Sequence, residues 1–415
     1  MRYLKIFLSI VLILFTFFIC GFAQNSCINC HSQLEDELKT PVDEIKNDVH
    51  LKIDGSCVNC HGGDPDVKFE DDMEAAMNPA KGYIGKPSRK TILKLCSRCH
   101  SNSTYMRNYN PNLPTDQYQQ YLTSQHGILL NKGDTKVAVC TDCHGVHSIQ
   151  SAKISTSKVF PNNIPETCGH CHSDQEYMKD YSIPTDQLDL YKQSVHGINL
   201  FEKGDRSSPT CNSCHGNHGA FPPGISSISN VCGTCHVTQV EMFSQSPHQE
   251  AYAEMDLPQC ESCHGNHDIK KTSVEMIGVG SESYCITCHD EGSEGYEQAK
   301  SMKEVQDSLN HKIELAENFL KEAENAGVEV SDGLFTVKDA HDILIKTRNA
   351  VHFFSLAKYE EVITPGFEIA DKALTEGQLA LKEVKSRRVA LAIVSIIIFI
   401  VAISLHFKIK MIKKG

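Results

Sequence analysis

The sequence predicts a chain in two parts. The first has short helices and loops with little regular structure, and the second has long α-helices and one C-terminal transmembrane helix. Three observations lead to this prediction. Of the 19 cysteines, 18 form nine copies of Cys-x-x-Cys-His, all before residue 290. Apolar residues then recur at three- and four-residue steps from Val305 to Ala323, which is typical of an amphipathic helix. Residues 389–407 form an apolar run without a formal charge.

The repeated motif is the attachment signature of a c-type haem. Two thiols about one helical turn apart bond to two vinyl groups of the porphyrin, and the next residue places an imidazole under the iron. Zinc would need paired Cys-x-x-Cys units with no fixed histidine. Disulfides would not require a histidine at every fifth position. The sequence therefore predicts nine c-type haems and a haem-organised multihaem cytochrome c domain over residues 24–290.

The predicted attachment residues are Cys27, Cys30, Cys57, Cys60, Cys96, Cys99, Cys140, Cys143, Cys168, Cys171, Cys211, Cys214, Cys232, Cys235, Cys260, Cys263, Cys285 and Cys288. The predicted proximal iron ligands are His31, His61, His100, His144, His172, His215, His236, His264 and His289. Covalent haems would form the core of this domain, because about thirty residues per haem leave too little chain for an independent apolar core. The chain without haem is therefore not expected to fold there.

The charge of the chain limits its partners. The formal net charge is −12, and each haem would add two propionates. An acidic surface disfavours nucleic acid and anionic lipid as partners.

Residues 1–23 have the pattern of a secretory signal peptide. Arg2 and Lys5 precede an apolar run over 6–18, and residues 21–23 form a small-x-small cleavage site. Cleavage there would remove Cys20. Two alternatives remain open: Cys20 as a lipidated first residue, and an uncleaved signal anchor.

The run over residues 389–407 is long enough to span a bilayer. Three basic residues precede it and four lysines follow it, so flanking charge does not set the orientation. Haem is attached to exported chains, which would place the haem domain on the extracytoplasmic, or periplasmic, side. Residues 408–415 would then be a cytoplasmic tail, and the helix a single-pass C-terminal anchor in the cell membrane.

The middle of the chain repeats over residues 96–147 and 168–218, with a shortened copy over 232–267. Each copy contains two haem motifs, a Ser-x-His between them, and a second histidine three residues after the second motif. Two extra histidines would give both irons a sixth ligand, and an iron with histidine on both faces suits electron transfer. The predicted distal ligands in these copies are His126, His147, His196, His218, His248 and His267.

The N-terminal copy is incomplete. His50 precedes the motif at Cys57 and is a seventh distal candidate, but Asp64 stands where a second histidine is expected. The motif at Cys27 has no upstream histidine either, so two of the nine irons lack a ligand in this count. A histidine so close to a proximal ligand reaches a neighbouring iron more easily than its own, which favours closely paired haems. His170 lies inside a motif and is interpreted as a bystander.

Residues 291–385 are expected to be helical. A first helix should end at Gly327, a second should run from about 336 to 363, before Pro365, and a third should continue into the membrane. His341 and His352 are eleven residues apart, close to three turns, and so share one helix face. Together with His311, these are further candidates for the two missing distal ligands.

The pattern Ser-x-His-Gly, Gly-Asp and Cys-x-x-Cys-His-Gly-x-His over residues 27–289 resembles the multihaem cytochromes with doubled motifs, the broad cytochrome c3/c7-like group. The stretch 350–353 is similar to a helical distal-ligand segment of larger members. The resemblance implies haems with two histidine ligands, packed in a chain that serves electron transfer in anaerobic respiration. The expected partners are a membrane quinol-oxidising or cytochrome b-type subunit and soluble or surface redox proteins.

Two enzymatic alternatives stay open beside electron transfer. The chain could reduce a small nitrogen or sulfur oxyanion at one open haem near the N-terminus, or oxidise quinol directly. Cytochrome c nitrite reductases use a Cys-x-x-Cys-Lys motif, which does not occur in this sequence. Octahaem enzymes that oxidise hydroxylamine or reduce tetrathionate keep one haem open, and the incomplete first repeat is where such a haem would lie.

Overall fold

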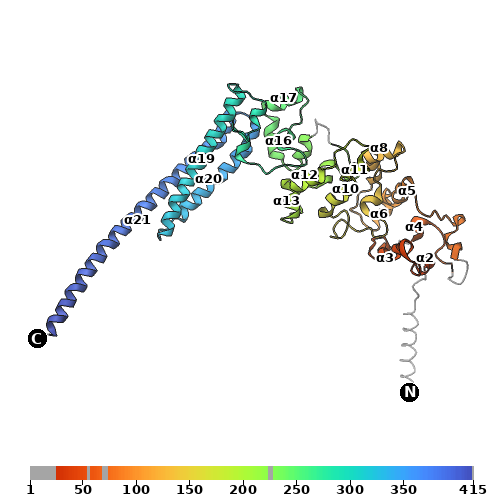
Figure 1. Cartoon of the computed structure of the whole chain (residues 1–415), viewed down its shortest axis with the longest axis horizontal. Helices are drawn as coiled ribbons and strands as arrows, with labels where there is room; N and C mark the ends of the chain where they lie inside the picture. Colours follow the sequence, from red (N-terminus) through yellow and green to blue (C-terminus); the bar gives the residue numbers. More distant parts are fainter. Residues whose placement is uncertain (1–24, 54–56, 68–72, 223–227, 414–415) are drawn as a thin grey trace, which may run out of the picture. The chain divides into compact units, whose positions relative to one another are not determined.

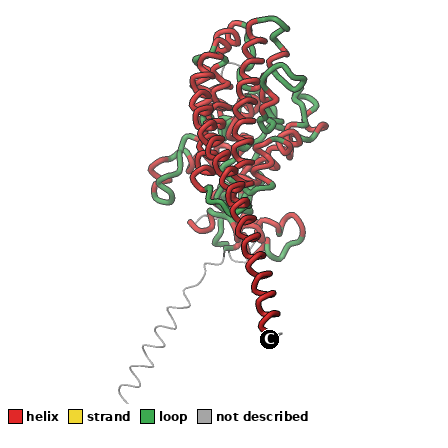
Figure 2. The backbone as a smooth tube through the Cα atoms, turned by 90° about the vertical axis from the view of Figure 1, so that its left-hand side faces the viewer, coloured by secondary structure: helices red, strands yellow, loops and turns green. Residues whose placement is uncertain are grey.

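The computed structural model describes residues 25–53, 57–67, 73–222 and 228–413, which form helices joined by turns and loops (Figure 1). No strand occurs among these residues (Figure 2). The predicted signal sequence and Cys20 lie outside the described residues. The chain forms two compact units, residues 1–223 with 267–269, and residues 224–266 with 270–415.

The first unit consists of short helices, and most Cys-x-x-Cys-His motifs in it form one helical turn. Its α-helices are α2 (Ser26–His31), α3 (Thr40–Glu44), α4 (Cys57–His61), α5 (Arg89–His100), α6 (Ser103–Arg107), α7 (Gln117–Thr123), α8 (Gln125–Asn131), α9 (Cys140–His144), α10 (Ile164–His172), α11 (Gln175–Met178), α12 (Gln187–Gln193), α13 (Val195–Phe201) and α14 (Cys211–His215). Its 3₁₀ turns are η1 (Asp36–Leu38), η2 (Ile45–Asn47), η3 (His50–Ile53), η4 (Met73–Met77), η5 (Pro79–Lys81) and η6 (Pro161–Asn163). A cluster of only four buried apolar residues forms there, from Leu93, Leu130, Val137 and Val139.

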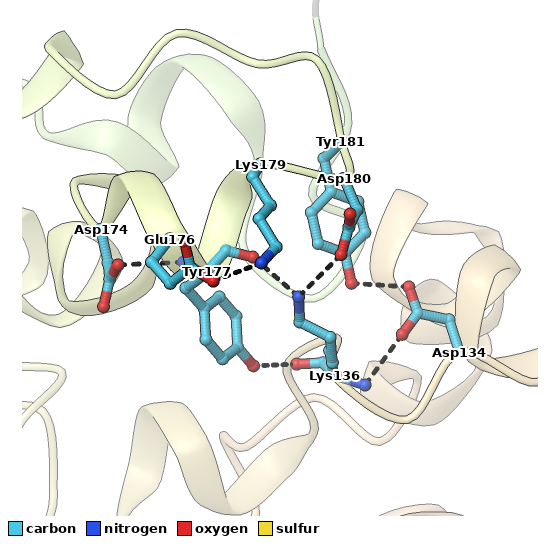
Figure 3. Close-up of polar contacts among 8 residues, drawn as sticks. All are labelled: Asp134, Lys136, Asp174, Glu176, Tyr177, Lys179, Asp180 and Tyr181. Atoms are coloured by element: carbon cyan, nitrogen blue, oxygen red, sulfur yellow. Dashed lines mark hydrogen bonds and ion pairs between the residues drawn. The ribbon is translucent and has the colours of Figure 1, made fainter.

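Polar contacts fasten successive repeats to each other within this unit (Figure 3). Lys136, just before the motif at Cys140, donates from Nζ to the Tyr177 carbonyl at 2.9 Å and lies 3.3 Å from the Asp180 carboxylate. The Tyr181 hydroxyl donates to Asp134 at 2.7 Å. These bonds hold the loop before one motif against the helix that follows the next motif.

The second unit combines short helices with a three-helix bundle. Its α-helices are α15 (Ile228–Gly233), α16 (Val237–Ser244), α17 (Pro247–Glu254), α18 (Glu261–His264), α19 (Glu294–Asn325), α20 (Ser331–Ala350) and α21 (Leu356–Ile412), and its 3₁₀ turns are η8 (Val274–Met276), η9 (Cys285–Thr287) and η10 (Val351–Phe353).

The bundle of α19, α20 and α21 buries a continuous apolar core of 18 residues, which includes Leu309, Ile313 and Leu344. The Tyr359 hydroxyl donates to Gln306 at 2.6 Å inside this core, so these two buried side chains satisfy each other. Helix α19 ends just before Gly327, which adopts a φ of +80°, as its sequence pattern predicts.

The position of the second helix boundary differs from the prediction. Pro365 lies inside α21, and the chain breaks instead at η10, between α20 and α21. Gly366 lies at a close helix contact, because a Cβ there would lie 2.8 Å from Leu309 Cδ2 and 2.9 Å from Ile343 Cγ2. Gly366 therefore serves close helix packing rather than helix termination.

The C-terminal part of α21 continues beyond the bundle (Figure 1). Its apolar residues over 389–407 are exposed, and α21 is the only helix of the described chain long and apolar enough to cross a membrane. This arrangement is compatible with a single-pass C-terminal anchor.

The last Cys-x-x-Cys-His motif packs directly on the bundle. A Cβ at Gly295, in the first turn of α19, would lie 2.3 Å from His289 Nδ1. Gln239 of α16 donates to Asn349 of α20 at 3.1 Å. Residue 290 is thus a boundary of composition, whereas the compact units meet in sequence near residue 223.

Candidate functional site

Histidine rings lie in pairs along both units. Seven pairs have ring centres between 5.8 and 6.1 Å apart. The pairs are His50–His100, His61–His147, His126–His172, His144–His218, His215–His267, His248–His289 and His264–His352. Every pair combines one predicted proximal ligand with one predicted distal ligand.

The pairing follows two rules that depend on the position of the motif within its repeat. The proximal histidine of a second motif faces the Gly-x-His histidine of the following repeat, as His144 faces His218. The proximal histidine of a first motif faces the Ser-x-His histidine of the preceding repeat, as His172 faces His126. Each repeat therefore contributes rings to its neighbours rather than to itself.

These pairing rules show which motif histidines of the incomplete first repeat have a histidine ring against them. Although Asp64 replaces the expected second histidine, His61 still has a histidine ring against it. The ring centres of His61 and His147 are 6.1 Å apart. The prediction placed both missing ligands near the N-terminus. The structure instead sets His147 against His61, and it is His264 that faces a histidine of the helical segment, His352. Among the described proximal histidines, His31 is the exception, because no histidine ring lies against it. Its ring hydrogen-bonds to the Leu38 carbonyl.

The two rules also give different ring orientations. In the pairs that involve second motifs, the ring planes are 8° to 24° apart. In the pairs that involve first motifs, the angle is 53° to 89°. The structure thus contains near-parallel and steeply inclined imidazole pairs.

Hydrogen bonds fix the tautomer of several rings. Nδ1–H donates to a backbone carbonyl from His31 to Leu38 at 2.8 Å and from His61 to Gly85 at 2.8 Å. His50 Nδ1 lies 2.9 Å from the carboxylate of Asp48, which is 3% exposed. Such bonds leave Nε2 as the free nitrogen for a metal. Asp48 was not identified from the sequence, although an acid two residues before a candidate ligand is a usable signal.

Burial keeps many of these imidazoles neutral. It is the largest cause that lowers the pKa of ten of them, all in ring pairs: His100, His126, His144, His147, His172, His218, His248, His264, His267 and His352. Neutral imidazole is the form that binds a metal, so the buried positions suit ligation.

The Ser-x-His-Gly motif forms a corner between two short helices. Ser124 Oγ accepts from Gly127 N at 2.9 Å and donates to the Tyr121 carbonyl at 2.6 Å. A Cβ at Gly127 would lie only 1.9 Å from that carbonyl oxygen. The corner thus positions His126, and Ser194 and Gly197 repeat the same bonds in the next copy.

Substitution of Gly127 tests this corner. We expect Gly127→Ala to push α8 away from α7 and to destabilise the fold by about 1–3 kcal/mol. The displaced His126 should then leave His172, which thermal unfolding and the low-spin haem signal would report. Gly280→Ala is the control, because nothing lies within 4 Å of the added methyl. Equal unfolding temperatures for the two variants would contradict the role of the corner.

Between α20 and α21, the side chains of His352 and Phe354 contact the histidine pairs of the second unit. His352 faces His264 at 6.1 Å, and its Nδ1–H donates to the Asn349 carbonyl at 2.9 Å. Phe354 adopts a φ of +43°, uncommon for a bulky residue, and its ring centre lies 4.1 Å from that of His248. The sequence offered no signal for Phe354.

The other helical candidates lie elsewhere. The His341 side chain is 42% exposed, and its Nε2 atom is 3.8 Å from the Glu317 carboxylate. His311 is exposed on α19, and His170 is exposed on α10. None of these three faces a proximal histidine. His196 and His236 have interaction partners of their own in the structure.

The motif cysteines form contacts that link successive motifs. Within repeats, the thiols lie close enough to shift each other's pKa in the pairs Cys27–Cys57, Cys96–Cys140, Cys168–Cys211 and Cys232–Cys260. Between repeats, electrostatic interactions join Cys60 to Cys96 and Cys143 to Cys171. Each motif is therefore beside the next one within its unit.

The ring spacing fits a metal between two imidazoles. A metal–imidazole bond is about 2 Å long and the ring centre lies about 1 Å beyond the nitrogen, so imidazoles on opposite faces of one iron have centres about 6 Å apart. The observed 5.8 to 6.1 Å matches this value. No group of three or more His, Cys, Asp or Glu side chains is arranged to hold an ion within the described part of the chain.

No protein-family model, no curated protein and no solved structure matches this chain.

Proposed function

We propose that this chain is a membrane-anchored electron conduit with nine covalently attached c-type haems. The observation that carries the proposal is the set of seven histidine pairs, each of which joins a motif histidine to a histidine of another segment at the spacing of two axial ligands. When bound, each haem would supply one-electron iron chemistry. Two histidine ligands close the iron to substrates, which favours electron transfer over catalysis.

The contacts between motif cysteines support a continuous path within each unit. A thioether sulfur would be bonded to the edge of its porphyrin, so neighbouring thiols such as those of Cys96 and Cys140 would bring two porphyrin edges close together in space. Electron tunnelling falls steeply with distance, and short edge separations therefore permit fast transfer. The buried surroundings of the histidines would tune the reduction potentials of bound irons through low dielectric and hydrogen bonding.

Haem content and spin state test this proposal. The oxidised full chain in mild detergent should contain nine haems by pyridine haemochrome assay, and low-spin signals should dominate its EPR spectrum. Near-parallel imidazole planes should give rhombic low-spin signals, whereas steeply inclined planes should give strongly anisotropic ones, so both types are expected. A chain without haem, or with mostly high-spin iron, would contradict the proposal.

The proposed orientation places the haems outside the cytoplasmic membrane and the end of α21 in the bilayer. An anchored conduit of this kind would receive electrons from, or deliver them to, a quinol-oxidising or cytochrome b-type membrane subunit, and exchange them with soluble or surface redox proteins. Co-purification of a membrane cytochrome or quinone enzyme in mild detergent would support this partner. Isolation of the free chain alone, under conditions that preserve such complexes, would count against it.

A further inference from the structure

His31 is the exception among the motif histidines. The described residues include all 21 histidines of the chain, and none of their rings lies against His31. The pairing rules explain why. The proximal histidine of a first motif receives its partner from the preceding repeat, as His100 receives His50, and no histidine precedes residue 31 in this sequence.

His31 is nevertheless arranged as a proximal ligand. Its Nδ1–H donates to the Leu38 carbonyl at 2.8 Å, the same device that orients His61. Nε2 is therefore the nitrogen left for iron. The motif itself is complete, and Cys27 contacts Cys57 of the next motif, so this haem would be joined to the rest of the chain.

We propose that the haem held by Cys27, Cys30 and His31 keeps its sixth position open and binds a small uncharged molecule, such as nitric oxide, carbon monoxide or hydroxylamine. This inference rests on the haem loading proposed above. The first haem would then be the one that binds an external ligand, whereas the other irons would have both axial positions occupied. It would lie next to the second haem and could exchange electrons with it.

The charge around His31 selects the class of ligand. Residues 25–53 contain six carboxylates and three lysines. Glu35, Asp36 and Glu37 are exposed beside Leu38, whose carbonyl accepts the His31 hydrogen bond. The haem propionates would add further negative charge. A negative potential lowers the local concentration of anions, so nitrite and sulfur oxyanions are disfavoured relative to neutral ligands.

A methionine ligand is the competing arrangement. Turn η4 packs against α2 and carries Met73 and Met77. A thioether at the sixth position would close this iron and raise its reduction potential. The spectrum separates the two arrangements, because a ferric iron with His and Met ligands has a characteristic near-infrared charge-transfer band.

Carbon monoxide titration of the reduced full chain in detergent is the test. We expect about one molecule bound per chain of nine haems and one high-spin ferric component by EPR before reduction. Hydroxylamine should shift that component, and nitrite at equal concentration should shift it much less. The double variant Cys27→Ala/Cys30→Ala should lose carbon monoxide binding, whereas the matched variant Cys285→Ala/Cys288→Ala, at a haem motif whose histidine faces His248, should keep the site at the first haem.

Several outcomes would overturn the inference. Nine low-spin haems without carbon monoxide binding would show that the first iron is closed, and would leave the conduit intact. A His–Met band that disappears in Met73→Leu/Met77→Leu would assign the sixth ligand to methionine. Carbon monoxide binding that persists in Cys27→Ala/Cys30→Ala would place the open iron elsewhere. A chain with no haem would instead overturn the proposed function itself.

Discussion

A chain made without haem attachment is expected to lose its ordered structure from residue 25 to 290 and to keep the bundle of α19, α20 and α21. The bundle has its own core of 18 buried apolar residues, and each fully buried Leu or Ile contributes about 1.5–3 kcal/mol. The first unit has an apolar cluster of four residues, too few to offset the conformational entropy of its loops. Covalent haem would supply the missing core.

Hydrogen–deuterium exchange of the full chain in detergent would measure this difference region by region. The chain with all nine motifs changed to Ala-x-x-Ala-His should exchange within seconds over 25–290, and remain protected over the bundle core. The haem-loaded chain is the control, with protection in both regions. Protection of residues 25–290 in the variant would show that the polypeptide folds there without haem.

Removal of His352 is expected to open one iron. His352→Ala takes away the ring that faces His264 at 6.1 Å, so the haem of the motif at Cys260 would lose its sixth ligand. One haem should change from low-spin to high-spin, its reduction potential should rise, and carbon monoxide binding should increase by about one molecule per chain. EPR and carbon monoxide titration of the same sample would measure both effects.

His341→Ala is the matched control for this variant. His341 lies on the same segment, but its ring is beside the partly exposed carboxylate of Glu317. An exposed ion pair contributes little to stability, so neither spin state nor stability should change measurably. A high-spin component in His341→Ala, with none in His352→Ala, would reverse the assignment.

Much of the candidate site is readable from the sequence. The nine motifs, the seven distal candidates of the repeats, and a supporting histidine from the helical segment all come from spacing alone. What spacing does not give is the partner of each ring. The second histidine of a repeat lies against a motif histidine of the preceding repeat, so His147 faces His61, and His352 of the helical segment faces His264.

The helical segment shows the same division. The 3.6-residue pattern predicts α19 and its end at Gly327, because both are local properties of the chain. The position of the helix break at η10 cannot be predicted from the local sequence. It depends on how α20 and α21 pack against α19 and against the histidines of the second unit. Pro365 and Gly366 look like a helix end in the sequence, but Gly366 is required where Leu309 and Ile343 come close.

The sequence by itself determined the nine Cys-x-x-Cys-His motifs, the number of repeats, the helical nature of residues 294–412 and a span long enough for a membrane. Each of these follows from residue type and spacing along the chain. Only the tertiary structure decided which histidine faces which motif, that His352 rather than His341 or His311 reaches a proximal histidine, and that His31 has no histidine against it. These outcomes depend on contacts between segments up to about ninety residues apart, and the order of residues along one segment does not specify them.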